Sequence, residues 1–162
     1  MPGNQLFGID LNATLTAANG APAVPVGTLH WDQLGRLWQY VKGGGTLAQY
    51  EYCKISTDGN FTITSMTTTT NPSTEPAQVG CVQVSGGFTT SLYGWIFRGF
   101  GAHTGLFAAS CVQDVKIYTT ATSGVVDDAA TTLVAGLKLI TTITGAAASP
   151  AWASGLLTTA NA

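Results

Sequence analysis

Hydrophobic and polar residues alternate along short stretches of this chain, and glycines or prolines separate these stretches. In residues 37–42 every second side chain would face the same side of a strand. The two alternating sets are Leu37, Gln39 and Val41, and Trp38, Tyr40 and Lys42. Three glycines follow at positions 43–45 and favour a tight turn or bulge. This pattern predicts a short strand that ends near residue 42.

The same pattern recurs and predicts a series of short strands. They are Leu37–Lys42, Tyr50–Ser56, Asn60–Thr67, Gln78–Ser85, Leu92–Arg98, Ser110–Val112, Val115–Thr119 and Trp152–Leu157. The Asp58-Gly59 pair favours a hairpin because its preferred turn needs positive φ. Turn signals every 8 to 15 residues or so predict an all-β domain, a compact barrel or sandwich with little helix.

Four other segments interrupt or qualify this strand pattern. Residues 67–76 are polar with two prolines and predict an exposed loop, and Gly99–Gly101 predicts a turn or bulge. Residues 146–150, ending in Ser149-Pro150, predict another turn. A helix over Asp127–Leu137 stays an alternative, since Asp can begin a helix although the threonines and Gly136 disfavour it.

Residues 1–27 differ from the rest and predict an extended N-terminal arm, with residues 28–162 as a single β-rich domain. Prolines at 2, 22 and 25 favour extended backbone. We interpret the segment as an arm along a neighbouring molecule or along the domain itself, and a frayed terminus is the alternative. The apolar residues that would anchor the arm are Leu6, Phe7, Ile9 and Leu11.

Charge is unusually sparse in this composition. Only 9% of the residues are charged, against about 25% in a typical domain, and the net charge is −2. The six cations are spread singly, so we expect no binding of nucleic acid. No apolar stretch is long enough to span a bilayer and no signal peptide is recognised. We therefore expect no membrane partner and synthesis in a reducing cytoplasm.

The residues that usually carry chemistry do not form a recognisable motif. Cys53, Cys81 and Cys111 lie far apart, and we interpret them as structural thiols. Zinc binding with His30 or His103 and an intermolecular bridge are the weaker alternatives. The few acids mostly lie at predicted turns, and neither histidine belongs to a hydrolase motif. We expect no catalytic residue, metal or cofactor.

Large aromatic residues are the remaining candidates for function. They are Trp31, Trp38, Tyr40, Trp95 and Phe97, with Trp152 near the C-terminus. Such rings most often form the core or a subunit interface, because each supplies a large rigid apolar area. A platform on which sugar rings stack is the alternative.

The order of several segments resembles the small capsid decoration proteins, also called cement or head-auxiliary proteins, of tailed bacteriophages. The segments are Gly35-Arg-Leu-Trp-Gln-Tyr-Val-Lys42, Val79-Gly80-Cys-Val82, Tyr93-Gly94-Trp95-Ile96, Val115-Lys-Ile-Tyr118, Ser123-Gly124-Val-Val-Asp-Asp128 and Val134-Ala-Gly136. This resemblance covers residues 28–160 and implies a β-barrel or β-tulip domain that is often trimeric. It also implies an N-terminal arm that contacts the major capsid protein, and it transfers no catalytic residue.

The expected function is therefore that of a non-enzymatic virion protein. It would bind the outer surface of the major capsid protein lattice as a homotrimer and stabilise the expanded phage head. A carbohydrate-binding module of a phage head or fibre is one alternative. A structural protein of the tail or neck is another.

Overall fold

The structure is a computed structural model that describes residues 11, 14–16, 24–68, 77–129 and 131–160. The described residues form strands and connecting segments without a helix, so the predicted all-β class is confirmed. In order, the strands are β1 (Thr14–Thr16), β2 (Leu29–Trp31), β3 (Leu37–Gly43), β4 (Tyr52–Ile55), β5 (Thr62–Ser65), β6 (Gln78–Cys81), β7 (Leu92–Phe107), β8 (Ile117–Thr119), β9 (Val126–Asp127), β10 (Leu133–Leu139) and β11 (Ala147–Ala160).

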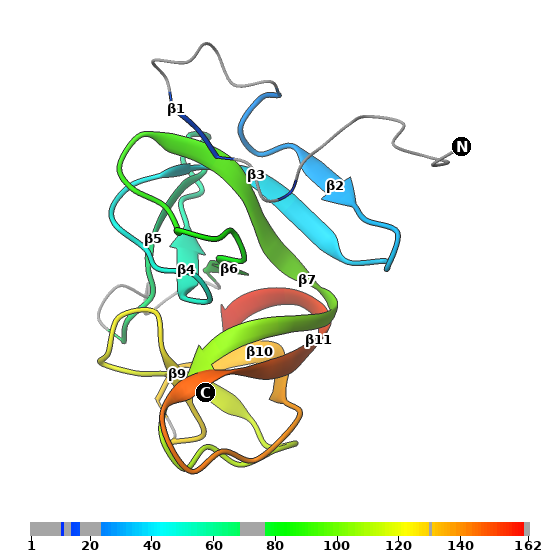
Figure 1. Cartoon of the computed structure of the whole chain (residues 1–162), viewed down its shortest axis with the longest axis vertical. Helices are drawn as coiled ribbons and strands as arrows, with labels where there is room; N and C mark the ends of the chain where they lie inside the picture. The colour runs from blue at the N-terminus through cyan, green and yellow to red at the C-terminus, as the bar shows by residue number, and fades with distance from the viewer. Residues whose placement is uncertain (1–10, 12–13, 17–23, 69–76, 130, 161–162) are drawn as a thin grey trace.

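All of these strands belong to one sheet that closes on itself twice around β7. In the first ring, the N-terminal half of β7 pairs with β3, then β5, β4 and β6 follow, and β6 returns to β7. In the second ring, the C-terminal half of β7 pairs with β11, followed by β10, β8 and β9. Figure 1 shows the two rings one above the other, with β7 running through both. This closure favours the barrel over the sandwich.

Two apolar clusters fill these rings. The smaller cluster takes side chains from the first ring, including Val41, Ile55, Ile63 and Ile96, all of them fully buried. The larger cluster joins Trp38, Tyr40, Trp95 and Phe97 on the other face of β3 and β7 to side chains of the second ring. β3 is consequently buried on both faces, whereas β11 alternates between buried and exposed residues.

β7 bends where it passes from one ring to the other. Gly99, Phe100 and Gly101 all have positive φ, and the register of β7 shifts against both β3 and β11 near this point. A Cβ atom on Gly99 would lie 2.1 Å from the carbonyl oxygen of Gly155. The predicted bulge at Gly99–Gly101 is thus present, but the strand continues through it to Phe107.

Several local predictions were wrong or incomplete, among them the strand predicted over Gln78–Ser85, which ends at Cys81. Residues 110–112 are not a strand, since Ser110 adopts positive φ in a turn. The alternative helix at 127–137 is replaced by strands β9 and β10, because neighbouring strands pair with both sides of β10. Residues 147–150 begin β11 rather than a turn, since they pair with residues 104–107 of β7. The strand predicted from Val115 begins at Ile117.

The described part of residues 1–27 lies on the body of the protein. β1 pairs with Leu92–Gly94 at the start of β7, and Leu11, Val24 and Val26 pack against the larger cluster. The Gly27 N–H donates to the carbonyl oxygen of Tyr40 at 2.7 Å. These parts of the predicted arm contact the domain itself.

No helix in the described residues is both long and apolar enough to cross a membrane.

Candidate functional site

Exposed apolar side chains gather on the side of the molecule where β7 bends. The group that we call the bend surface consists of Leu29, Trp31, Leu34, Trp152 and Leu156. Each of these side chains is roughly half or more exposed, from 46% for Leu156 to 75% for Leu34. Where exposed apolar side chains form a contiguous patch, the patch often marks an interaction site.

The pairing of the strands brings these residues together. The Trp31 ring lies 5.0 Å from the ring of Phe100 at the bend, measured between centroids. Leu156 is the register partner of Gly99, and Trp152 is the register partner of Ala102. Figure 1 shows the β2–β3 hairpin, the bend of β7 and the passing β11 on the same side of the molecule.

Asp32 holds the β2–β3 hairpin in shape. Its carboxylate accepts hydrogen bonds from the backbone N–H groups of Leu34 and Arg36, from the Arg36 guanidinium at 2.7 Å and from the Trp38 indole at 3.0 Å. Partial burial acts to raise the pKa of Asp32, but the hydrogen bonds from Arg36 and Trp38 outweigh it and lower the pKa. The hairpin is therefore a rigid support for Trp31 and Leu34.

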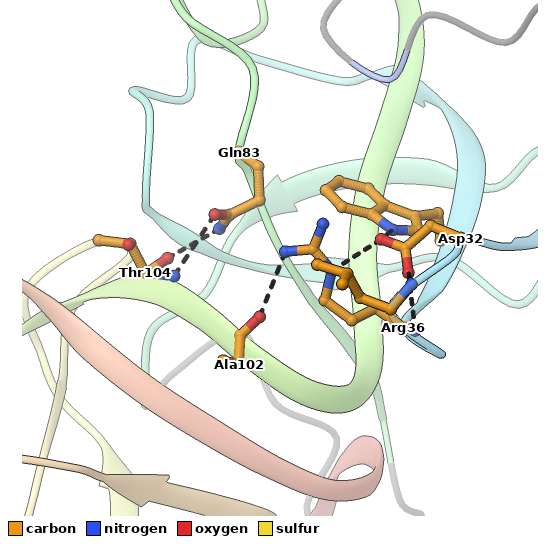
Figure 2. Close-up of polar contacts among 7 residues, drawn as sticks. Asp32, Arg36, Gln83, Ala102 and Thr104 are labelled. Carbon is orange, nitrogen blue, oxygen red and sulfur yellow. Dashed lines mark hydrogen bonds and ion pairs between the residues drawn. The ribbon is translucent and has the colours of Figure 1, made fainter. Parts of the chain in front are cut away.

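Arg36 connects this hairpin to the bend of β7. Its guanidinium donates to the carbonyl oxygen of Ala102 at 3.4 Å, and its aliphatic stem lies beside Gly101. Two residues further along β7, the carbonyl oxygen of Thr104 accepts a hydrogen bond from the Gln83 amide at 2.7 Å. Figure 2 shows both contacts along the same strand. Side chains from two loops therefore fix the backbone of the bend.

The structure separates the five predicted aromatic residues into two groups. Trp38, Tyr40, Trp95 and Phe97 lie in the larger cluster and are at most 5% exposed, whereas Trp31 is 54% exposed. Trp152 is also half exposed. The sequence showed no signal for the other members of the bend surface, because isolated leucines are common on protein surfaces.

Of the four apolar residues predicted to anchor the arm, only Leu11 is among the described residues. It is half-buried and packs against the larger cluster of this chain. Leu6, Phe7 and Ile9 lie outside the described residues, so their role stays a prediction.

His103 and Tyr52 form a buried polar pair in the centre of the molecule. The Tyr52 hydroxyl and Nε2 of His103 are 3.0 Å apart, and the imidazole stacks on Phe97. Burial lowers the pKa of His103 to about 3, and burial also raises the pKa of Tyr52 well above its usual value. Both groups are therefore neutral near pH 7, which suits packing better than proton transfer.

Arg98 is buried at the junction of β6, β7 and β11 without an ion-pair partner among the described residues. Its guanidinium donates to the carbonyl oxygen of Val79 in β6 and, at 3.0 Å, to that of Leu157 in β11. Burial lowers the pKa of Arg98 to about 10, so it remains charged. The side chain supplies donors to strand carbonyls where β7 changes partners, which is a structural role.

The three cysteines are buried free thiols. Burial raises the pKa of Cys53 to about 12 and that of Cys81 well above its usual value, so neither is a thiolate near pH 7. Their positions fit the structural interpretation.

Cys111 lies beside Asp127 and Asp128, which sequence reasoning did not connect. Their ligand atoms are all within 4.8 Å of one another. Burial and the two carboxylates raise the pKa of Cys111 to about 11, and burial raises the pKa of Asp127. A divalent cation with sulfur and oxygen ligands is the species this group could hold, although zinc usually takes four ligands. The Asp127-Asp128 doublet was visible in the sequence, but its contact with Cys111 depends on the second ring.

Comparison with known proteins gives no assignment, since no family model, no curated protein and no solved structure matches this chain.

Proposed function

We propose that this chain is a non-enzymatic structural protein of a tailed-phage head. It would bind the outer surface of the major capsid protein lattice and stabilise the expanded head. The observation that carries this proposal is the bend surface, which places half-exposed tryptophans and leucines on a rigid closed sheet. The order of segments that resembles capsid decoration proteins supplies the identity of the partner.

The physical reasoning concerns contact area. A protein that holds capsid subunits together against internal pressure acts by adding buried area across their seams. A single interface of roughly 1,600 Å² is sufficient for a specific contact, and contacts repeated over a lattice act together. A surface with few charges loses little solvation free energy when such a contact forms.

The arm is the second part of the proposal. Leu6, Phe7 and Ile9 would contact the major capsid protein, while the domain would sit on the outer face of the virion. Residues 14–16 and 24–27 contact the body, so a clean test leaves them in place.

Expanded heads that lack this protein provide the test. The full chain should co-sediment with them and raise the temperature at which they release DNA. A chain without residues 1–10 should retain its fold but bind much more weakly, because the arm contacts would be absent. Failure of the full chain to bind any expanded head would reject the proposal.

Carbohydrate binding is the second candidate, and the exposure of Trp31 and Trp152 favours it. Sugar rings stack on exposed aromatic faces, and Trp31 is backed by Phe100. Titration with glycans of the host cell surface should then change tryptophan fluorescence, and Trp31→Ala should abolish the change. An unchanged spectrum across the glycans would remove this candidate.

A further inference from the structure

β2 is the last strand at one edge of the described sheet. It pairs only with β3 among the described strands, with Leu29, His30 and Trp31 opposite Gln39, Trp38 and Leu37. The flanking hydrogen bonds, Tyr40 N–H to Thr28 C=O and Asp32 N–H to Arg36 C=O, fix the phase of this ladder. In an antiparallel ladder the bonded positions alternate, so the N–H and C=O groups of residues 29 and 31 point away from β3.

The same two residues carry exposed apolar side chains. Leu29 is 55% exposed and Trp31 is 54% exposed, and both are on the face of β3 that carries Leu37 and Gln39. The edge also lacks the lysine, proline and bulge by which proteins usually protect such strands. Within the part of the chain that the structure describes, backbone groups without a strand partner and exposed apolar area therefore coincide on β2.

Charge does not oppose the approach of a second copy. The charged residues between β2 and β3, Asp32 and Arg36, form an ion pair with each other at 2.7 Å. The whole chain has a net charge of only −2, so long-range repulsion between two copies is weak.

We propose that β2 pairs antiparallel with β2 of a second copy of this chain and forms a twofold dimer. A twofold axis that passes between the two His30 residues would place Leu29 of each copy opposite Trp31 of the other copy. Each of these two pairs would form two main-chain hydrogen bonds, and each leucine would pack beside an indole ring. This contact is isologous, because the same strand serves both copies.

The available area sets the strength of this dimer. Leu29, Trp31 and Leu34 together expose on the order of 350 Å², compared with roughly 800 Å² per partner in a standard interface. The dimer is therefore weak and reversible in dilute solution. On a lattice that is contacted through Trp152 and Leu156 and leaves Leu29 and Trp31 free, the high local concentration would favour it. It differs from the trimer that the family resemblance implies, and it does not depend on capsid binding.

Sedimentation equilibrium of the purified full chain over a range of concentrations is the first test. The expected result is a monomer–dimer equilibrium for the natural chain. Leu29→Lys should weaken it at least about tenfold, because two lysines would flank the paired strands. Ile140→Lys makes the same kind of change at a side chain that is 45% exposed and distant in sequence, and it should leave the equilibrium unchanged.

Hydrogen exchange of the natural chain gives a second readout that needs no substitution. The amides of Leu29 and Trp31 should become protected as concentration rises, whereas the amide of His30, which faces β3, should be protected throughout. A monomer at every concentration, a trimer, or equal sensitivity to Leu29→Lys and Ile140→Lys would overturn the proposal. Because the assay contains no capsid, its result is separate from the test of the proposed function.

Discussion

The two rings that share β7 bury their strands in different ways. In the first ring β3 is buried on both faces, because the smaller cluster fills one side and aromatic residues of the larger cluster cover the other. In the second ring β11 has one buried face, lined by small residues such as Ala151 and Ala153, while Trp152 and Leu156 face outward. β3 therefore contributes more to stability than β11, and the outward face of β11 leaves side chains free for contact.

A matched pair of tryptophan substitutions tests this difference most strongly. Trp38→Ala should lower the free energy of unfolding by about 4 kcal/mol, because the side chain is 5% exposed and its indole donates to Asp32. Trp152→Ala should cost less than half as much, about 1 to 2 kcal/mol, since half of that side chain is exposed. Urea unfolding followed by circular dichroism measures both. Equal losses would contradict the contrast between the rings.

The connection between the rings depends on Gly99. Gly99→Ala should cost about 3 kcal/mol, because the new methyl group would overlap the carbonyl oxygen of Gly155 and force β7 and β11 apart. Gly155→Ala is the control, since a Cβ at that position meets no atom within 4 Å. Thermal unfolding of the two variants compares them. A stable Gly99→Ala protein would show that the bend is not constrained in this way.

The buried histidine makes stability depend on pH. His103 has a pKa of about 3 in the folded protein, below its ordinary value of 6.5, so the unfolded chain binds the proton more readily. The contribution of neutral His103 to the free energy of unfolding is fully present above pH 6.5. It is lost as the pH falls toward 3. Between pH 7 and pH 5 we expect a loss of about 2 kcal/mol.

Urea unfolding at the two pH values measures this loss. Asp32 and Asp58 have lowered pKa values and stay ionised over this range, so they add little to the change. The raised pKa of Asp127 acts in the opposite direction and favours folding as the pH falls. His103→Gln should abolish most of the dependence on pH. The same dependence in both proteins would assign it to another group.

The smallest effect concerns the hairpin that carries Trp31. Asp32→Asn should cost about 1 kcal/mol, because it weakens the hydrogen bonds from Arg36 and Trp38 without changing the size of the side chain. Asp114→Asn is the control at an exposed position. The melting temperature of each variant gives the comparison, and an unchanged Asp32→Asn protein would show that the hairpin needs no such support.

The sequence predicted the elements that depend on local patterns. The alternation at residues 37–42 and the Asp58-Gly59 turn correspond to β3 and to the β4–β5 hairpin, which pairs Lys54 with Thr64. β11 was predicted only from residue 152, because alanines and Pro150 favour a turn locally. In the folded chain Pro150 pairs with Thr104, and its carbonyl oxygen accepts from the N–H of Ile140. Long-range pairing thus decides a segment whose local signals point elsewhere.

The candidate site was less predictable than the fold. The sequence identified the tryptophans as candidates for the core or for an interaction surface. It could not tell which of them are buried, because burial depends on the side of the closed ring that each one faces. Trp31 and Trp38 lie in neighbouring strands, and only Trp31 is exposed. The contact between Cys111 and the Asp127-Asp128 doublet also needs the second ring to close.

The proposed function requires that this chain covers the capsid lattice of a phage. The most direct measurement is its copy number in purified virions, from gel densitometry against the major capsid protein. Coverage of the lattice predicts a ratio near one, or a simple fraction such as one third. A few copies in each particle, or none, would contradict it.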